Sequence, residues 1–558
     1  MLLDHNPSLG SQGVTLAKPV SSRSVEIYDT TLRDGAQTQG IQFSAQDKIA
    51  VANLLDEFEV DYIELGWPGA NPTDNEVFKH FQQYPLKNAS LVAFGATAKP
   101  GEEPENSRLM QSLIDAPVSV VTLVAKTSKF HIENILQTTI EENCRAIAAS
   151  VDWCRRHGKR VWLDAEHFFD GYVEAPSVSL ACLVAAIEAG AEGVTLCDTN
   201  GGRLPQEVKD VTQQMTDMFN TQFAIHAHND CELAVANALA ALQGGATVVQ
   251  GCVNGYGERC GNTNLTSLMA ILATKTDFTF AAQKNLFRLT EMSRTVSARA
   301  NRTPDAYAPF VGSSAFAHKA GLHASAVQKF SDSYEHVAPE FVGNQRKILV
   351  SSQAGRSNLK HKISQFKLPN IDLANCLQLI KQRESLGFQY EEGDASLELL
   401  LLRQQPRYTP PFVIEELVEN TLARRGKVSM HHASLKVKVG DCVEWTAAEG
   451  HGPVETIDKA LRQALVKHWS ELNQVDLADY KVRILNPECA TAATTHVWIA
   501  SQFNSELSHS IGCSESIFEA SLQAICDSFE FFIVKQTNYL TSLNLTYEKG
   551  SNNGNKAA

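Results

Sequence analysis

The chain of 558 residues lacks the features that would mark a membrane or secreted protein. No apolar run approaches the ~20 residues that a membrane-spanning helix needs. Residues 1–22 have neither a basic start nor an apolar central stretch, so we expect an unstructured tail rather than a secretion signal. The 12 cysteines include no C-x-x-C pair, which favours reduced and mostly buried thiols in the cytoplasm.

Positive charge is also scarce, because 49 lysines and arginines face 63 aspartates and glutamates and give a formal net charge of −14. Proteins that bind a polyphosphate backbone gain affinity by neutralising phosphates with cations, so we expect no nucleic-acid partner. The composition, 43% hydrophobic and 20% charged, is typical of folded globular proteins. At roughly 100–200 residues per domain, the length predicts several domains.

Short β-branched segments alternate with longer helix-like segments, such as 45–58 and 233–243, between residues 25 and 252. Eight such units favour a closed (β/α)8 TIM barrel, of class α/β, over an open doubly wound sheet. The expected strands are 25–29, 62–65, 91–94, 120–125, 161–166, 193–197, 223–226 and 248–252.

The pattern changes twice further along the chain. After about residue 280 the sequence becomes helical or irregular, and closely spaced prolines at 406–411 indicate an entry into another domain. The expected parts are a tail at 1–22, a catalytic barrel at 23–285, helical linker subdomains over the active site at 286–400, a C-terminal domain at 405–543 and a tail at 544–558.

The C-terminal domain contains an internal repeat with an offset of 60 residues. The segments that begin at Gly452 and Gly512 agree at six of thirteen positions. Each copy is expected to be a helix preceded by two strands, at 434–439 and 443–448, then at 480–485 and 496–502. Such a repeat predicts one pseudo-symmetric α+β domain of ββα type, with chance similarity of two amphipathic helices as the alternative. Since catalytic residue types are not concentrated there, we expect a binding or regulatory role.

Polar residues follow six of the expected strands, at the end of the barrel where such enzymes carry their catalytic groups. Six polar strand ends on one rim are difficult to explain by solvation alone. They comprise Asp29, Arg33 and Asp34; Glu64; Asp164, Glu166 and His167; Asp198, Thr199 and Asn200; His226, His228, Asn229 and Asp230; and Asn254.

His226 and His228 are two residues apart, so in an extended segment both imidazoles face the same way and can share a cation. With Asp34 they form a ligand set that leaves other positions open. Arg33 would suit an oxyanion or a substrate carboxylate, with a rim salt bridge as the alternative. The glycines of 255–261 do not fit G-x-G-x-x-G, so we expect no dinucleotide-binding fold.

Three motifs, DTTLRDGAQ at 29–37, HAHND at 226–230 and GYGERCGN at 255–262, resemble the signatures of the acyl-CoA Claisen-condensing metallo-barrels. That family includes the 2-isopropylmalate, homocitrate and citramalate synthases. Residues 410–540 resemble its amino-acid-sensing regulatory domain. GWPGANPT at 66–73 and YEHVAPEFVGN at 334–344 are more similar to the citramalate branch, as is DGAQ in place of DGEQ.

The resemblance implies a role for each of several residues. The implied metal ligands are Asp34, His226, His228 and Asn262, for Mg²⁺ or Mn²⁺, with Zn²⁺ as the alternative. The resemblance further implies that Arg33 polarises a 2-oxo group, that Glu166 and His323 take part in proton transfer, and that Thr199 and Tyr334 contact the oxo acid.

The implied reaction is the metal-dependent condensation of acetyl-CoA with pyruvate by a cytoplasmic homodimer, regulated by isoleucine at the C-terminal domain. The nearest alternative is the same reaction on 2-oxoisovalerate. A biotin-dependent carboxyltransferase barrel would need a carbamylated lysine, for which Lys126 is the candidate, but the usual Met-Lys-Met is absent. A barrel without activity that serves only as an amino-acid sensor is the third alternative.

Overall fold

The computed structural model describes residues 23–350, 356–366, 368, 371–422, 429–503, 506–537 and 539–542. The expected tails, 1–22 and 544–558, therefore lie outside the described residues. The chain divides into two compact units: the first holds residues up to Phe316 together with Val337–Gln345, and the second holds Ala317–His336 and the chain from Arg346 on. Among the described residues, no helix is both long and apolar enough to cross a bilayer.

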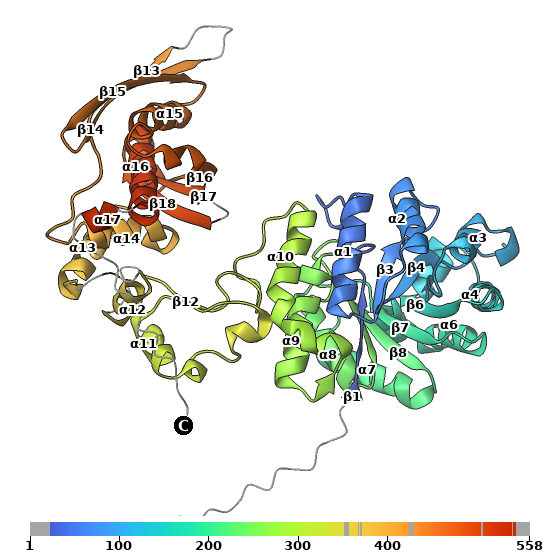
Figure 1. The fold of residues 1–558 in the computed structure, drawn as a ribbon. Helices are drawn as coiled ribbons and strands as arrows, with labels where there is room; N and C mark the ends of the chain where they lie inside the picture. The colour runs from blue at the N-terminus through green and yellow to red at the C-terminus, as the bar shows by residue number, and fades with distance from the viewer. Residues whose placement is uncertain are drawn as a thin grey trace, which may run out of the picture. The chain divides into compact units, whose positions relative to one another are not determined.

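The first unit is built on a closed barrel of eight parallel strands with helices around it, which confirms the predicted fold (Figure 1). The barrel closes where the first of these strands pairs with the last. The barrel strands are β2 (Glu26–Asp29), β3 (Tyr62–Gly66), β4 (Ser90–Ala96), β5 (Val120–Lys126), β6 (Arg160–Glu166), β7 (Gly193–Asp198), β8 (Gln222–Ala227) and β9 (Val248–Gly251). All eight predicted strands lie within two residues of the observed bounds.

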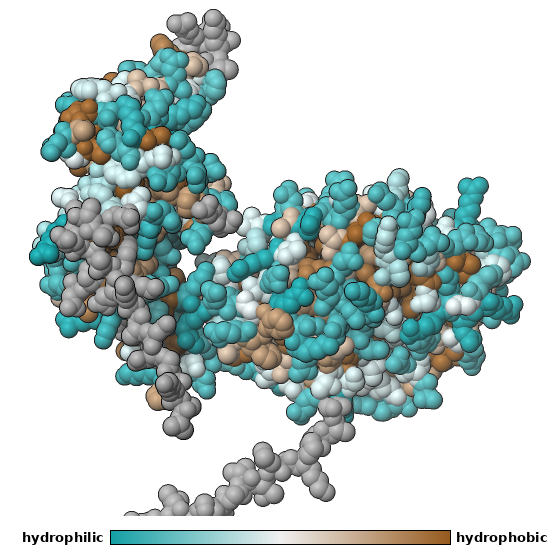
Figure 2. Space-filling view, in the orientation of Figure 1, coloured by the Kyte–Doolittle hydropathy of each residue, from teal (hydrophilic) through white to brown (hydrophobic). Residues whose placement is uncertain are grey.

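A helix follows each strand on the outside of the barrel. The outer helices are α1 (Ala45–Phe58), α2 (Pro72–Gln83), α3 (Arg108–Asp115), α4 (Ile140–Arg156), α5 (Phe168–Glu174), α6 (Pro176–Glu188), α7 (Pro205–Met218), α8 (Ala234–Gln243), α9 (Leu265–Lys275) and α10 (Leu289–Arg299). Below them a short parallel pair, β1 (Arg23–Ser24) with β10 (Phe278–Thr279), ties the start of the described chain to the end of the barrel. Figure 2 shows that the visible face of this unit is mostly hydrophilic, because the apolar sides of its helices turn inward.

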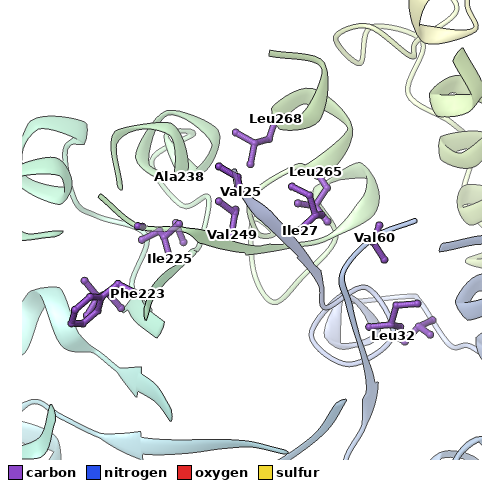
Figure 3. Packing of buried hydrophobic residues seen from close by; sticks show 14 of the residues in the cluster. Val25, Ile27, Leu32, Val60, Phe223, Ile225, Ala238, Val249, Leu265 and Leu268 are labelled. Carbon is purple, nitrogen blue, oxygen red and sulfur yellow. The ribbon is translucent and has the colours of Figure 1, made fainter. Parts of the chain in front are cut away.

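The outward-facing side chains of the strands form the main hydrophobic core with these helices. Figure 3 shows Ile225 and Val249, from β8 and β9, gathered with Leu265 and Leu268 of α9. Alternate residues of a strand point to opposite faces, so the residues between them point into the barrel.

The inside of the barrel is arranged in layers. The lowest is apolar and aromatic, with Tyr62 packed between Tyr28 at 5.4 Å and Trp162 at 6.3 Å between ring centroids. Two residues further along the strands lies a buried polar layer made of Glu64, Thr122, Asp164, Thr195, His226 and Gln250. Strand alternation therefore places a rigid floor beneath the polar groups and leaves the third layer open at the mouth.

The second unit begins with short helices and a two-residue strand pair and ends in an α+β domain. Its helices before that domain are α11 (Gly321–Lys329), α12 (Arg356–Phe366), α13 (Leu373–Ser385) and α14 (Asp394–Leu402), with the pair β11 (Ala317–His318) and β12 (Lys347–Ile348). The domain contains two antiparallel sheets, each followed by a helix (Figure 1). The first copy is β13 (Val413–Leu422), β14 (Met430–Val439), β15 (Cys442–Gly450) and α15 (Pro453–Leu465); the second is β16 (Asp476–Ile484), β17 (Thr495–Phe503), β18 (Glu506–Ser514) and α16 (Ile517–Gln536), with α17 (Tyr539–Ser542) after it.

The predicted repeat is thus present, and each copy holds one strand more than the sequence indicated. The additional strand is β13 in the first copy and β18 in the second. The first is acidic and mostly exposed, and the second is rich in serine, so neither carries the apolar alternation by which a strand is recognised. The helices α15 and α16 pack on the two sheets and form a shared apolar core with them.

A buried ion pair joins the first two barrel helices. Lys48 of α1 contacts Asp74 of α2, with 2.5 Å between Nζ and Oδ1, and also donates to the carbonyl of Leu65 at 3.2 Å. Both charged side chains are less than one-tenth exposed. Removing one partner of such a pair leaves the other charge buried and uncompensated.

We therefore expect Lys48→Met to destabilise the barrel by about 3–5 kcal/mol. The measurement is hydrogen exchange of peptides from β2–β9 in increasing urea, which reports on the barrel separately from the second unit. The matched control is Lys79→Met, on the exposed face of α2, which should change barrel stability by less than about 0.5 kcal/mol. Equal effects of the two variants would contradict this role of the pair.

Candidate metal centre

The mouth of the barrel brings Asp34, His226 and His228 together, with one ligand atom of each lying within 4.8 Å of the others. Asp34 follows β2, His226 lies in β8, and His228 follows that strand by one residue. All three are buried. The two imidazoles reach the same point because they are alternate residues of one extended segment.

Asn262, the fourth expected ligand, lies beside them. It forms an isolated β-bridge with His228, and its Nδ2 is 3.4 Å from Nε2 of His226. Its Oδ1 is buried and has no hydrogen-bond partner in the described part of the chain. Gly257 makes this position available: it has φ of +154°, and a Cβ there would lie 2.1 Å from Oδ1 of Asn262.

The surroundings of Asp34 and His228 favour the forms in which these two groups bind a metal. Although burial opposes it, the charge of Arg33 holds the pKa of Asp34 well below its usual range. Burial, with the neighbouring His226, lowers the pKa of His228 to about 4. At neutral pH the site therefore offers an ionised carboxylate and a neutral imidazole, which are the forms that bind a metal.

Arg33 is held in a fixed orientation next to Asp34. Its Nη1 donates to Asp34 at 2.9 Å, and its Nε donates to the buried carboxylate of Glu64 at 2.5 Å. The guanidinium also lies 3.8 Å above the ring of Phe94. Within the described residues its Nη2 makes no hydrogen bond, so one arm of the fork remains for a ligand at the barrel mouth.

A cavity of about 430 Å³ opens at this end of the barrel, within the size range of small-molecule sites. Its wall includes Arg33, Asp34 and both histidines, and it also includes Glu166 and Thr199 from neighbouring strand ends. Glu166 is paired with Lys126, its neighbour across β5 and β6. The Thr199 hydroxyl accepts a hydrogen bond from the backbone N–H of His167 at 2.8 Å.

The residues at the barrel mouth fit a divalent cation. The site offers one carboxylate and two imidazoles, and the partnerless amide oxygen of Asn262 could complete the set. Nδ1 of His228 is likewise buried without a partner among the described residues. Mixed oxygen and nitrogen ligands suit several divalent metals and select none of them.

Two expected site residues belong to the other unit. His323 lies in α11, and Tyr334 follows it in the same unit, with the two rings stacked at 4.1 Å between centroids. Both side chains are exposed. The first unit by itself therefore assembles seven of the nine expected residues, namely Arg33, Asp34, Glu166, Thr199, His226, His228 and Asn262.

Several other polar strand ends support loops and do not line the cavity. Asp29 accepts hydrogen bonds from the backbone and hydroxyl of Thr31, and Asp198 accepts from the backbone N–H groups of Gly202 and Arg203. Asn254 bonds to two serines of α10. Their residue types match those of the ligands, so sequence alone could not separate the two groups.

Gln250 is a buried residue of the site that the sequence analysis did not single out. It lies in β9 and contacts His226 at 2.8 Å. The signal that could have found it is strand alternation, because it lies two residues after Val248, which is part of the apolar floor.

Comparisons with known proteins cover almost the whole described chain. Residues 24–296 match the HMGL-like family, residues 310–387 match the homocitrate synthase post-HMGL domain-like family, and residues 393–533 match the LeuA allosteric (dimerisation) domain. The (R)-citramalate synthase of Aquifex aeolicus is 42% identical over 92% of this chain and 98% of its own. That of Synechocystis sp. is 41% identical over 93% of this chain and 98% of its own. A probable 2-isopropylmalate synthase of Methanopyrus kandleri is 30% identical over 90% of this chain and 96% of its own.

We predict that His228→Ala weakens Mn²⁺ binding by at least about 100-fold, because it removes one of the ligands. Binding is measured by electron paramagnetic resonance of free Mn²⁺, and thermal unfolding of the metal-free protein should change little. His80→Ala, on α2 away from the cluster, is the control and should bind Mn²⁺ like the wild type. Unchanged affinity in the His228 variant would remove it from the ligand set.

Proposed function

The chain belongs to the family of the (R)-citramalate synthases, and on that premise we propose that it condenses acetyl-CoA with pyruvate and water to give citramalate and free CoA. It is an acyltransferase that converts the acyl group into an alkyl group on transfer. The reaction is the first step of a route from pyruvate to isoleucine. Because its substrates are central metabolites of the cytoplasm, we propose that the enzyme acts there.

The observation that carries the proposal is similarity over the full length, through barrel, linker and regulatory domain alike. The barrel architecture hosts many chemistries, so it could not support a substrate by itself. The likeness to a 2-isopropylmalate synthase is weaker over the same span, which favours pyruvate over 2-oxoisovalerate.

Asp34, His226, His228 and Asn262 would hold a divalent cation, Mg²⁺ or Mn²⁺ by preference and Zn²⁺ as the alternative. When bound, such a cation supplies Lewis-acid polarisation of a 2-oxo group. The protein contributes the buried surroundings that strengthen this effect, and an aspartate whose pKa is low enough to remain a carboxylate.

Arg33 binds the 2-oxo oxygen of pyruvate in this proposal. As C2 is attacked, that oxygen becomes an alkoxide, and the guanidinium stabilises the developing charge. Its orientation is fixed before substrate arrives, since Glu64, Asp34 and the ring of Phe94 hold it on three sides. No reorganisation is then needed when the charge develops.

Glu166 lines the cavity wall, and in this proposal it is the carboxylate that moves a proton. Forming the enolate of acetyl-CoA requires a base to take a methyl proton, and the carbon acid is weak, so the base must be well positioned. Lys126 positions Glu166 from the adjacent strand. Thr199 contacts the oxo acid in this proposal. The roles proposed for His323 in proton transfer and for Tyr334 in contacting the oxo acid are supported by the resemblance of the sequence motifs.

We further propose a homodimer regulated by isoleucine, with both functions placed in the domain from 393 to 533. The match to an allosteric dimerisation domain supports this placement. Hydrolysis of the CoA thioester makes the reaction effectively irreversible, and an irreversible first step is a suitable point for inhibition by an end product.

The remaining alternatives have less support. A carboxyltransferase would require carbamylation of Lys126, which would place a new anion against Glu166, its present partner. A barrel that only senses amino acids has no use for a buried cluster of three metal-binding side chains.

We predict that pyruvate has a kcat/KM at least about 10-fold above that of 2-oxoisovalerate, because each additional carbon that a pocket rejects is worth about 1–3 kcal/mol of discrimination. The assay follows free thiol from acetyl-CoA for both acids under the same conditions. Chelator should abolish turnover and added Mg²⁺ or Mn²⁺ should restore it. A preference for the branched acid would show the nearest alternative to be correct.

Isoleucine should lower the rate of thiol release at subsaturating pyruvate by about 5-fold or more, the usual range of allosteric coupling. Leucine and valine, tested at the same concentrations on the same full-length chain, serve as controls for effector choice. Inhibition by leucine but not by isoleucine would assign the effector differently, and an effect of neither would contradict a branched-chain effector.

A further inference from the structure

Gln250 occupies the centre of the buried polar layer beneath the candidate metal centre and is fully buried. Its side-chain oxygen lies 2.8 Å from Nδ1 of His226. Its Nε2 lies 2.9 Å from Oδ1 of Asp164 and 2.9 Å from the hydroxyl oxygen of Thr195. The amide thus joins three neighbouring strands, β6, β7 and β8, from its place on β9.

The partners of Gln250 determine which way its amide faces. Nε2 of Gln250 donates to the carboxylate of Asp164 and to the hydroxyl oxygen of Thr195. A carboxylate can only accept, and a hydroxyl can accept as well as donate, so the NH₂ end of the amide satisfies both groups. A rotation of the amide by 180° would set its oxygen against the carboxylate of Asp164. The carbonyl oxygen therefore faces His226, at 2.8 Å from Nδ1.

This orientation fixes the proton on the imidazole of His226. An amide oxygen can only accept, so Nδ1 of His226 must carry the hydrogen. In the neutral ring the lone pair is then on Nε2. That atom lies 3.5 Å from Oδ2 of Asp34 and 3.4 Å from the amide of Asn262, on the side where the four expected ligands meet.

We propose that Gln250 is a positioning residue that holds His226 in the tautomer and ring orientation required to bind the cation. This inference rests on the metal site of the proposed function and adds to it a residue that touches neither metal nor substrate. Hydrogen bonds from the second ring nitrogen of a ligating histidine commonly have this effect, and their loss lowers metal affinity by about 10–100-fold. Asp164 and Thr195 take part by accepting from the amide of Gln250 and so orienting it.

The test measures Mn²⁺ affinity of full-length variants by electron paramagnetic resonance, independently of turnover. Gln250→Met keeps the length of the side chain and removes the acceptor, so affinity should fall by about 10–100-fold. Gln250→Glu combined with Asp164→Asn keeps an oxygen that can accept from Nδ1 and supplies a donor to its second oxygen, so this double variant should recover most of the loss. Thr122 lies in the same layer as Gln250, and Thr122→Val removes its hydrogen bond to Tyr28. This variant is the control for general disturbance, and its Mn²⁺ affinity should stay within about 3-fold of wild type.

A measurement without any substitution keeps the inference testable if the methionine variant fails to fold. Solid-state NMR of the [¹⁵N]histidine-labelled full chain with Mg²⁺ should show His226 protonated at Nδ1, its signals being assigned by their loss in His226→Asn. Protonation at Nε2 would overturn the inference.

The outcomes separate this inference from the proposed function. Absence of Mn²⁺ binding in the wild type would contradict the metal site of the proposed function. Wild-type binding that is lost in His228→Ala but retained in Gln250→Met would leave the metal site standing and overturn the role of Gln250. Equal losses in Gln250→Met and in the double variant Gln250→Glu/Asp164→Asn would show that an acceptor for Nδ1 of His226 is not what supports metal affinity, and would overturn it too.

Discussion

The site depends on keeping one carboxylate, that of Asp34, ionised in the interior of a barrel. Burial alone would protonate it, and the adjacent charge of Arg33 prevents this. Such buried ion pairs contribute little net stability, because desolvation of both charges offsets their attraction. Arg33 is moreover shared with Glu64, so two carboxylates face a single guanidinium. Stability alone therefore does not explain why Asp34 is kept ionised at this position, whereas the proposed binding of a cation does.

Alternate residues of a β-strand face the same way, so the inward-facing side chains of one strand lie in successive layers of the barrel. Each layer has a different function. Along β6, Trp162 belongs to the floor, Asp164 to the polar layer and Glu166 to the open mouth, each two residues after the last. The floor is apolar and tightly packed, which gives the polar layer a rigid base. The polar layer in turn orients the groups above it through hydrogen bonds that have a direction. A side chain's role therefore follows from its register in the strand as much as from its chemical type.

The sequence was a good guide where the signal is periodic and a poor one where it is not. Eight strands could be located because each is apolar and β-branched, and the shared face of His226 and His228 follows from their spacing. The strands β13 and β18 were not predicted, because many of their residues are acidic or small. They form nonetheless, because pairing with a neighbouring strand overrides a weak strand propensity. Asp29 and Asp34 are five residues apart with the same side chain, and only the local turn decides that one caps Thr31 and the other faces the cavity.

Two acidic residues of one cavity thus acquire different roles from their surroundings. Asp34 is almost fully buried and tied to a guanidinium and an imidazole, so it cannot readily take up a proton and is suited to hold a cation. Glu166 lies at the wall with a quarter of its side chain exposed, and its one ion pair is with an equally exposed lysine. Such a pair is weakened by water, so Lys126 leaves the carboxylate accessible to a ligand in the cavity. The same acidic group is thus enclosed at one position of the cavity and accessible at another, and this difference comes from the surroundings of the two residues.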